Sequence, residues 1–302
     1  MAIDANQFET AKNFAAVAAN MVGLDLNLAS TLYKDVAADF RAGGGNTVRI
    51  RVPGAPQSST KGVYDVTTPL EVGSITENGI DVVLDTHAYS SVVLSEGDLD
   101  LSIEDYSTQV LAPQSRSIAT YIERAAASAM QAVPAATSIT YDPTNPAKAF
   151  TAARRILRSN GVDNTVPLVA SVGAGVYADL LDANTTTAPV FDATGRVRGF
   201  DVQESTRLAE NEAVFYVPQA FALVVRAPQV PSGAPFGASI RTDDGQFALR
   251  YLRAFDSTVA ADRSIVSAFV GVTPLPLAVD NEDGTVSLVE NGGVVHLTGA
   301  VA

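Results

Sequence analysis

The sequence predicts an α+β protein with an N-terminal arm, an extended β-arm, a long helix with long strands, and an inserted α/β unit. Three observations lead to this prediction. Residues 47–52 and 80–85 alternate apolar and polar side chains around a looser stretch rich in Pro, Gly and Ser, which is typical of a long two-stranded ribbon. Residues 113–133 carry an apolar stripe at helical spacing. Residues 143–235 alternate helix and strand patterns, as compact α/β units do.

Composition and charge restrict the classes of function. Of the 302 residues, 47% are hydrophobic and 18% charged, which is enough apolar material for a sizeable core. The net charge of −13 disfavours a tight grip on nucleic acid, but not its enclosure. The absence of Cys excludes disulfides and thiolate metal sites. We expect neither a secretory signal nor a membrane span, because no basic start precedes an apolar run and no run approaches about 18 residues.

The N-terminal arm, residues 1–40, contains two helical patterns. Residues 6–22 place apolar side chains at three- and four-residue steps, with Phe8 and Phe14 as the bulky members. Residues 29–40 form a second pattern that ends at a glycine run. Neither pattern has enough bulky residues for a core, so we expect this arm to pack on another surface.

Residues 41–94 are expected to form the β-arm, with a hinge at Gly43, Gly44 and Gly45. A two-stranded ribbon of this length is marginal alone in water. Its own stretch of chain offers no obvious cover. A neighbouring copy of the chain would supply the missing surface.

Charged side chains on the two strands of the arm are placed to pair. Arg49 and Arg51 share one face of the outgoing strand, and Asp81 and Asp85 share one face of the return strand. They pair within one arm or between copies, unless both faces are simply solvated. The predicted inter-subunit contact residues are Phe8, Phe14, Arg49, Arg51, Lys61, Asp81 and Asp85.

The strongest helical pattern begins near Pro113 and ends at Pro134, positions that suit a first turn and a terminator. We expect Glu123 and the other polar residues to lie off its apolar stripe. That stripe is predicted to comprise Ile118, Tyr121, Ile122, Ala125, Ala129 and Met130.

The remaining elements follow from shorter patterns. In the α/β unit, helices are predicted at 146–160 and 176–182, and strands at 167–171, 200–204, 213–217 and 221–226. Long strands at 236–242, 246–256 and 264–273 suit a sheet beneath the long helix, and residues 277–302 resemble a β appendage.

No constellation of residues points to catalysis or metal binding. The two histidines, His87 and His296, have no partners that the sequence places beside them. Gly173 and Gly175 match a dinucleotide-binding fingerprint between a strand and a helix, although a tight turn explains them more simply. Residues 280–284 are more typical of a turn than of a calcium loop. We therefore predict no catalytic, cofactor or metal site.

Local phrases and the order of elements together resemble a known family. The phrases are residues 5–8, 31–34, 46–53 and 195–202. They resemble the major capsid (coat) protein of tailed double-stranded DNA bacteriophages, which has the Hong Kong ninety-seven fold. The similarity looks greatest to the coat-protein branch typified by Salmonella phage, and it covers about residues 3–273. The chain departs from that branch in lacking a large inserted accessory domain.

The resemblance implies a division of the chain into six parts. These are an N-terminal arm (1–40), an extended β-arm or E-loop (41–94), a peripheral domain with a spine helix (95–140), an axial domain (141–232), the peripheral return strands (233–273) and a C-terminal β extension (274–302).

The resemblance also implies a structural protein and not an enzyme. Pentamers and hexamers would close into an icosahedral shell around double-stranded DNA, without sequence-specific binding, cofactors or membrane contact. Scaffolding protein and portal would be partners, with decoration proteins as further candidates. The location would be the virion capsid, after assembly in the cytoplasm of a bacterial host. The alternatives are an encapsulin-like compartment shell and a dinucleotide-binding enzyme that uses the turn from Gly173 to Gly175.

Overall fold

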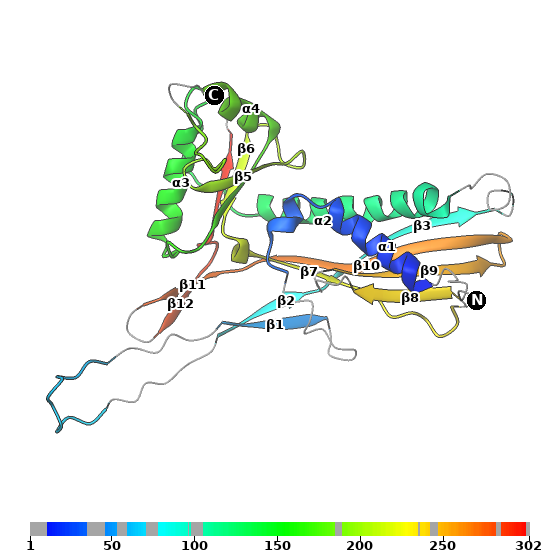
Figure 1. Ribbon diagram of the computed structural model, residues 1–302, viewed down its shortest axis with the longest axis horizontal. Coiled ribbons are helices and arrows are strands. Elements are labelled where there is room, and N and C mark those ends of the chain that lie inside the picture. Colours follow the sequence, from blue (N-terminus) through cyan, green and yellow to red (C-terminus); the bar gives the residue numbers. More distant parts are fainter. Residues whose placement is uncertain are drawn as a thin grey trace, which may run out of the picture.

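The computed structural model describes residues 11–34, 46–52, 59–70, 78–95, 97, 105–184, 189–234, 236–241, 247–281 and 285–299. Figure 1 shows three parts: a long sheet covered by helices, an α/β unit that stands at one end of it, and an arm that projects from the same end.

The long sheet is antiparallel and has β10 (Ala261–Pro274) at its centre. The strands that complete it are β3 (Thr86–Leu94), β9 (Ala248–Asp256), β8 (Phe236–Arg241) and β7 (Phe221–Arg226). β10 pairs with β3, β9 and β7, and β8 pairs with β9. The segment of β7, predicted to belong to the α/β unit, instead pairs with β10 in the long sheet.

Helix α2 (Ala112–Gln131) lies along this sheet, preceded by a π-helical turn, Ser107–Leu111 (Figure 1). Its predicted position is confirmed, with Pro113 in the first turn. The Gln114 amide donates to the Ser264 carbonyl at 3.0 Å and accepts from the Ser264 hydroxyl at 2.8 Å, which ties the helix to β10.

The predicted apolar stripe of α2 is wrong in part. Tyr121 is exposed, whereas Glu123 is buried. The helix contacts α1 as well as the sheet, so its buried face is wider than one stripe and turned away from Tyr121. The buried side chains are Gln114, Ser115, Ile118, Ala119, Ile122, Glu123, Ala126, Ala127 and Met130.

Helix α1 (Ala11–Leu24) confirms the first helical pattern of the N-terminal arm. It packs on β8, β9 and α2 of its own chain, so this segment does not need another subunit for cover. Small side chains, including Ala15 and Ala18, allow the close approach. In the described part of the second predicted helix, Leu28–Thr31 form a 3₁₀ turn and Leu32 is already extended, while residues 35–40 lie outside the described residues.

The α/β unit contains α3 (Ala147–Ser159), α4 (Ala174–Ala183) and a four-stranded sheet. The strand order is β13 (Val294–Thr298), β6 (Glu212–Tyr216), β4 (Leu168–Val172) and β5 (Phe200–Glu204). β4 and β5 are parallel, and the other pairs are antiparallel. The C-terminal segment was expected to be an appendage, yet β13 completes this sheet.

The short hairpin between β10 and β13 is formed by β11 (Leu277–Asp280) and β12 (Val286–Val289). The arm ribbon is formed by β1 (Thr47–Val52) and β2 (Asn78–Val83), which pair antiparallel. Two isolated strands of this kind gain little stability from each other, so the surroundings of the ribbon decide how it is held.

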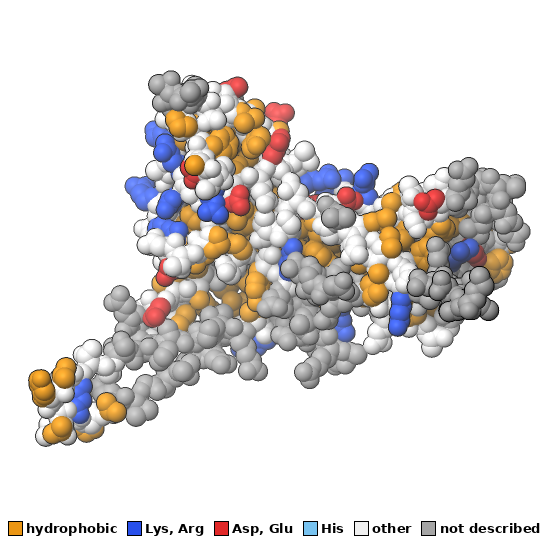
Figure 2. All heavy atoms as spheres, viewed as in Figure 1, with side chains coloured by type: hydrophobic (Ala, Val, Ile, Leu, Met, Phe, Trp, Pro, Cys, Tyr) orange, Lys and Arg blue, Asp and Glu red, His pale blue; other side chains and the backbone are white. Residues whose placement is uncertain are grey.

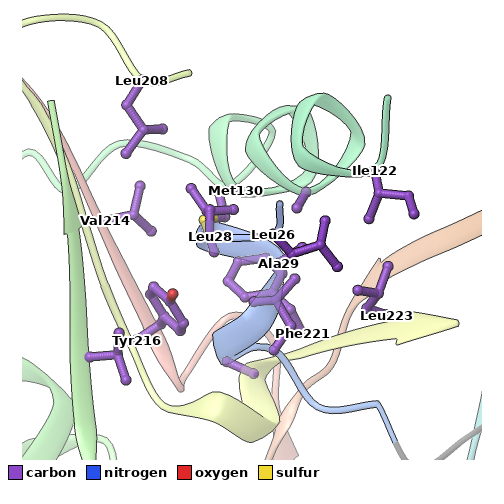
Figure 3. Close-up of a cluster of buried hydrophobic side chains, with 14 of the residues drawn as sticks. Leu26, Leu28, Ala29, Ile122, Met130, Leu208, Val214, Tyr216, Phe221 and Leu223 are labelled. Carbon is purple, nitrogen blue, oxygen red and sulfur yellow. The ribbon is translucent and has the colours of Figure 1, made fainter. Parts of the chain in front are cut away.

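One hydrophobic core runs through both the long sheet and the α/β unit. At their junction, Leu28 of the 3₁₀ turn and Met130 of α2 lie beside Tyr216 of β6 and Phe221 of β7 (Figure 3). Inside the unit, Phe150 packs against Phe215 with ring centroids 4.9 Å apart. The two parts therefore share a core.

Candidate assembly surfaces

The base of the arm packs on its own chain. Val82 of β2 is fully buried against Ala222 and Val224 of β7 and Leu275 beyond β10. This apolar contact, which we call the arm root, corrects the expectation that the ribbon has no cover within the chain. This cover is not evident from the sequence, because β7 and Leu275 are distant from the ribbon along the chain.

The register of the ribbon places Arg49 opposite Asp81 and Arg51 opposite Gly79. No ion pair joins Arg49 to Asp81, and the Arg49 side chain instead lies across Gly79, where the absence of a Cβ atom leaves room. Asp85 lies beyond the last ribbon pair and accepts a hydrogen bond from Thr86. Contacts of these charges with another copy remain a prediction.

Some of the predicted contact and hinge residues lie outside the described residues, and Phe14 packs inside its own chain. Phe8, the hinge Gly43, Gly44 and Gly45, and the side chain of Arg51 are outside the described residues. Phe14 is half-buried in α1, with ring centroids 5.5 Å from Tyr106 and 5.6 Å from Tyr251. Its described contacts are thus within its own chain.

The far end of the arm, residues 59–70, is the arm tip, and it exposes large apolar side chains. Val63 is 93% exposed, Tyr64 96%, Val66 92% and Leu70 82%. The space-filling view shows these orange side chains gathered at the extremity of the molecule (Figure 2). Contiguous apolar exposure of this kind marks an interaction site in soluble proteins.

The arm tip is nevertheless ordered by its own hydrogen bonds. The Asp65 carboxylate accepts from the Thr67 and Thr68 amides at 2.9 and 3.1 Å, and from both threonine hydroxyls. The Thr68 hydroxyl is the largest cause that lowers the pKa of Asp65, followed by the Thr67 amide. Lys61 Nζ donates to the Thr68 carbonyl at 2.6 Å. Lys61 therefore has a role within the tip, which holds its apolar side chains in a preformed turn.

The α/β unit carries opposite charges on two of its margins (Figure 2). Lys and Arg gather over α3, around a hollow lined by Lys148, Arg155 and Arg198. Arg154 Nη1 donates to the Arg198 carbonyl at 2.6 Å and holds that loop against the helix. Asp and Glu gather on the opposite margin, over α4 and the loop before β6. Exposed carboxylates of α4 and of the segment from the end of β5 to β6 are Asp182, Glu204 and Glu210.

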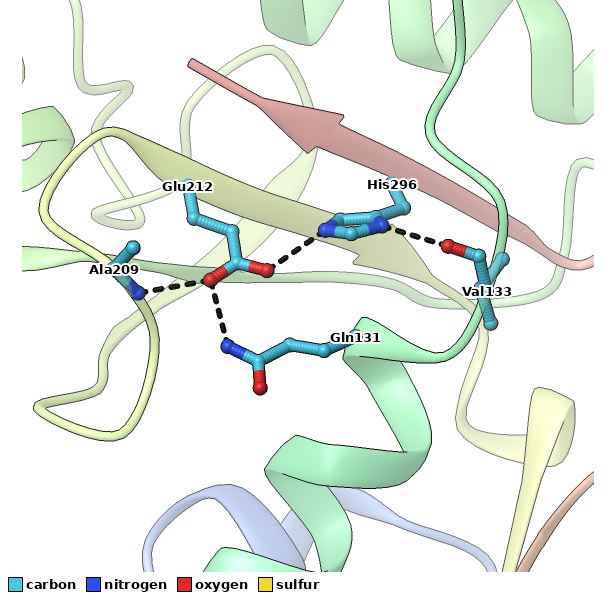
Figure 4. A network of polar contacts seen from close by, with 5 residues as sticks. All are labelled: Gln131, Val133, Ala209, Glu212 and His296. Atoms are coloured by element: carbon cyan, nitrogen blue, oxygen red, sulfur yellow. Dashed lines mark hydrogen bonds and ion pairs between the residues drawn. The ribbon is translucent and has the colours of Figure 1, made fainter. Parts of the chain in front are cut away.

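A buried polar network joins the end of α2 to the α/β unit (Figure 4). His296 of β13 lies with Nε2 2.7 Å from Glu212 Oε1 and with Nδ1 2.7 Å from the Val133 carbonyl oxygen. Glu212 Oε2 accepts from Gln131 Nε2 at 2.9 Å and from the Ala209 amide at 2.8 Å. Both carboxylate oxygens of Glu212 therefore have hydrogen-bond partners.

The charge state of this network follows from its geometry. Burial opposes ionisation of Glu212, but the donors Ala209, Gln131 and His296 outweigh it, so the pKa of Glu212 is lowered. A carbonyl only accepts, so His296 Nδ1 donates to Val133. When Glu212 is ionised, Nε2 donates as well. The histidine has a structural role, which the sequence indicated only by placing His and Glu inside apolar strands.

Glu123, predicted to lie off the apolar stripe of the long helix, is a second buried carboxylate. Its Oε1 accepts from the Asn27 and Ala29 amides at 2.8 and 3.0 Å, and its Oε2 accepts from the Leu28 amide at 3.1 Å. These amides begin the 3₁₀ turn, which would otherwise leave them unpaired. Glu123 thus fixes the N-terminal segment to α2.

The turn that resembles a dinucleotide site packs closely against the loop before β6. A Cβ atom at Gly173 would meet the Ala209 and Glu210 carbonyls, so glycine is required for close approach; its φ of −72° is ordinary. The Gly173 amide donates to the Glu212 carbonyl at 2.8 Å, and the Val176 amide to Glu210 at 3.1 Å. Two amides of this turn are therefore engaged by the chain itself, which disfavours a pyrophosphate site at this helix N-terminus.

The described residues include no group of three or more His, Asp or Glu placed to hold a metal ion. His87 lies beside Phe269, with ring centroids 4.9 Å apart, and desolvation lowers its pKa, with a smaller contribution from Arg250. Among the helices described, none combines the length and apolar character needed to cross a membrane.

Comparison with solved structures identifies the fold. No protein-family model and no curated protein sequence matches the chain. A structure from Mycobacterium phage Che8 aligns with a TM-score of 0.56 and 17% identity over 90% of this chain and 91% of that one. The capsid structure of Cyanophage P-SCSP1u gives 0.54 and 13%, over 86% and 85%. A virus-like particle from Pyrococcus furiosus gives 0.51 and 11%, over 95% and 98%. The chain has the phage capsid fold, which confirms the predicted fold class.

Proposed function

We propose that this protein is a major capsid subunit that assembles through pentamers and hexamers into an icosahedral shell around a double-stranded DNA genome. The observation that carries the proposal is the capsid fold over about nine-tenths of the chain, combined with an ordered, apolar arm tip. Exposing that tip to water has a free-energy cost that a neighbouring subunit would remove. The site of action would be the virion, with assembly in the host bacterial cytoplasm.

The two charged margins of the α/β unit support ring formation. If the basic margin over α3 meets the acidic margin of the next copy, the contact is head-to-tail, and such contacts close into rings. This assigns the axial part of the chain, predicted at about residues 141–232 and here taken without β7 and with β13, to the centre of each ring. Arg155→Glu would then weaken ring assembly, and the effect of added salt on assembly would shrink with it. A matched reversal outside the α/β unit, Arg124→Glu on the exposed side of α2, provides the control.

The overall acidity suits a shell that does not adhere to packaged DNA. A charge of −13 repels phosphate, and a protein that grips duplex DNA needs clustered cations. We expect weak duplex binding by the free protein. Strong binding that falls steeply with salt would contradict this part of the proposal.

Partners other than the chain itself follow from the capsid assignment. Scaffolding protein and portal would act during assembly, and decoration proteins are further candidates. Because Phe14 packs inside its own chain, contacts of the N-terminal segment with scaffold or a neighbour would use residues before α1, such as Phe8. The coat-protein branch typified by Salmonella phage is the branch that the local phrases favour.

A compartment shell that encloses proteins is the second candidate, favoured by the alignment with the Pyrococcus furiosus virus-like particle. The contents of the particles distinguish the two functions. We would express the chain, isolate particles by sedimentation and measure nucleic acid and co-purifying protein. Assembly that depends on scaffold and portal supports the phage capsid. A single enriched enzyme cargo without them would replace it with the compartment.

A further inference from the structure

Each copy of this chain has an apolar pocket at the arm root as well as an apolar arm tip. The pocket has a volume of about 390 Å³. Its walls include Ile50 and Ile80 from the ribbon, Val166 from the loop after α3, Val217 after β6 and Leu275 after β10. We call it the root pocket. It lies where the arm, the α/β unit and the long sheet meet.

The chemistry of the root pocket suits an aromatic side chain with a polar end. Most of its lining is apolar, and Asp163 and Gln219 contribute polar side chains. Small-molecule and side-chain sites commonly combine an apolar lining with a few polar groups that fix orientation. A buried tyrosine needs such a hydrogen-bond partner for its hydroxyl.

We propose that the root pocket of one copy receives Tyr64, together with its neighbour Val63, from the arm tip of a second copy. The proposal rests on the proposed shell function and deepens it by naming where the tip docks. Tyr64 and Val63 are almost fully exposed at the end of a turn that Asp65 holds in shape. Such a preformed turn loses little conformational freedom when it docks.

Charge and position both favour a second copy as the occupant. Lys61 lies three residues before Tyr64 on the tip, which also carries Asp65, and Asp163 is an exposed carboxylate at the pocket. Docking of Tyr64 would bring the Lys61 ammonium group toward the Asp163 carboxylate. Figure 1 shows the tip at the far end of the arm. Ile50 and Ile80 of the pocket lie in the ribbon at the base of the arm, so the tip of a copy is remote from its own pocket. One tip and one pocket per copy give a head-to-tail contact that leaves no tip unused in a closed assembly.

Occupation of the root pocket would connect three parts of the receiving subunit. Its walls come from the ribbon, the α/β unit and the segment that follows β10 of the long sheet. A neighbour's tip would therefore fix the arm of the receiving subunit against its body. The direction of that subunit's own tip would then be set by the copy before it.

The absence of cysteine permits a direct test by disulfide trapping. Gly62→Cys places a thiol at the tip, where a Cβ atom meets nothing closer than 3.5 Å. Ala278→Cys places one on the exposed side of the pocket lining. The control pairs Gly62→Cys with Ser257→Cys, an exposed position at the turn between β9 and β10. Each double variant is assembled, isolated as particles, oxidised mildly and separated without reductant.

The tip–pocket pair is expected to give a ladder of linked chains, because every copy has both thiols. Its yield should exceed that of the control pair by about ten-fold or more, since docking raises the effective thiol concentration. Particles that form normally without such a ladder would overturn the root-pocket proposal and leave the shell function intact. Failure of the wild-type chain to assemble, even with scaffold supplied, would instead reject the shell function on which the proposal rests.

A pair of substitutions at the tip supplies a second test without new thiols. Tyr64→Ala removes the ring and should weaken association of subunits by about 30-fold, as loss of an interface anchor does. Tyr64→Phe keeps the ring and removes the hydroxyl, so it should fall between wild type and Tyr64→Ala. Equal assembly of all three proteins would show that Tyr64 does not dock in any pocket.

Discussion

The arm root and the arm tip belong to one arm but differ in how their apolar side chains are covered. At the root, Val82 is fully buried against β7 of its own chain. At the tip, Tyr64 and Val63 are almost fully exposed, although hydrogen bonds around Asp65 order the turn. Burial of apolar area is what stabilises a fold. The comparison indicates that the root stabilises the subunit itself. Burial of the tip would stabilise an assembly of subunits.

The junction network should give the largest loss of folding stability. Glu212→Ala removes the acceptor of His296, Gln131 and the Ala209 amide in a buried site. Removing one partner of a buried pair costs about 3–5 kcal/mol, and we expect a loss of that size in the free energy of unfolding by denaturant. Glu210→Ala, two residues away and exposed, should change it by less than about 0.5 kcal/mol. Equal effects of both variants would show that the network does not stabilise the junction.

Acid should weaken the same network. The pKa of Glu212 is lowered in the folded chain from its ordinary value of 4.5, so the stability it contributes is present above that value and is lost as the pH falls through the folded pKa. We expect the melting temperature to decline below about pH 4.5, and less steeply in Glu212→Gln, which cannot ionise. A decline of the same steepness in this variant would assign acid sensitivity to other carboxylates, such as Asp256 and Asp192, whose pKa values are also lowered by threonine donors.

The arm root offers a matched pair of adjacent valines. Val82→Ala should lower the free energy of unfolding by about 2 kcal/mol, because it leaves a cavity beside Ala222, Val224 and Leu275. Val83, on the other face of the strand, is 41% exposed. Val83→Ala should cost less than about 0.5 kcal/mol. Similar costs at the two positions would mean that the ribbon does not pack on the body in solution.

The arm tip should show the smallest effect on folding and a large effect on assembly. Val63→Ser with Tyr64→Ser replaces apolar side chains that are almost fully exposed in the subunit, so the free energy of unfolding should change by less than about 0.5 kcal/mol. Particle yield, measured by sedimentation, should fall by about ten-fold or more. A double variant that unfolds readily, or that assembles as well as wild type, would remove the contrast between root and tip.

Local patterns were sufficient to predict much of the body. The helix after Pro113, the helix that ends before Gly161 and the long strands around β10 follow from spacing and terminators, and all are present. Gly161, just after the end of α3, has a φ of +98°, a backbone conformation that favours glycine. These features depend on residues close together in sequence.

Features that depend on distant pairing were missed. The sequence does not reveal that β13 pairs with β6 or that β7 joins the long sheet, because both pairings join distant segments of similar polarity. The burial of Glu123 and His296 depends on those pairings. The sequence predicts the arm as an assembly surface, but it does not predict that the root is buried and the tip exposed. Val82 and Val63 are the same residue type, and only their surroundings in the fold distinguish them.

The most direct test of the account is the mass of the purified protein in solution, measured by light scattering and followed by electron microscopy of the same fraction. The subunit has a mass of 31.4 kDa. We predict megadalton closed particles or capsomer-sized rings for the wild type, and a folded small species for the Val63→Ser, Tyr64→Ser variant. A wild-type protein that remains a small species, even with scaffold supplied, would contradict the claim that the arm tip is completed by a neighbouring subunit.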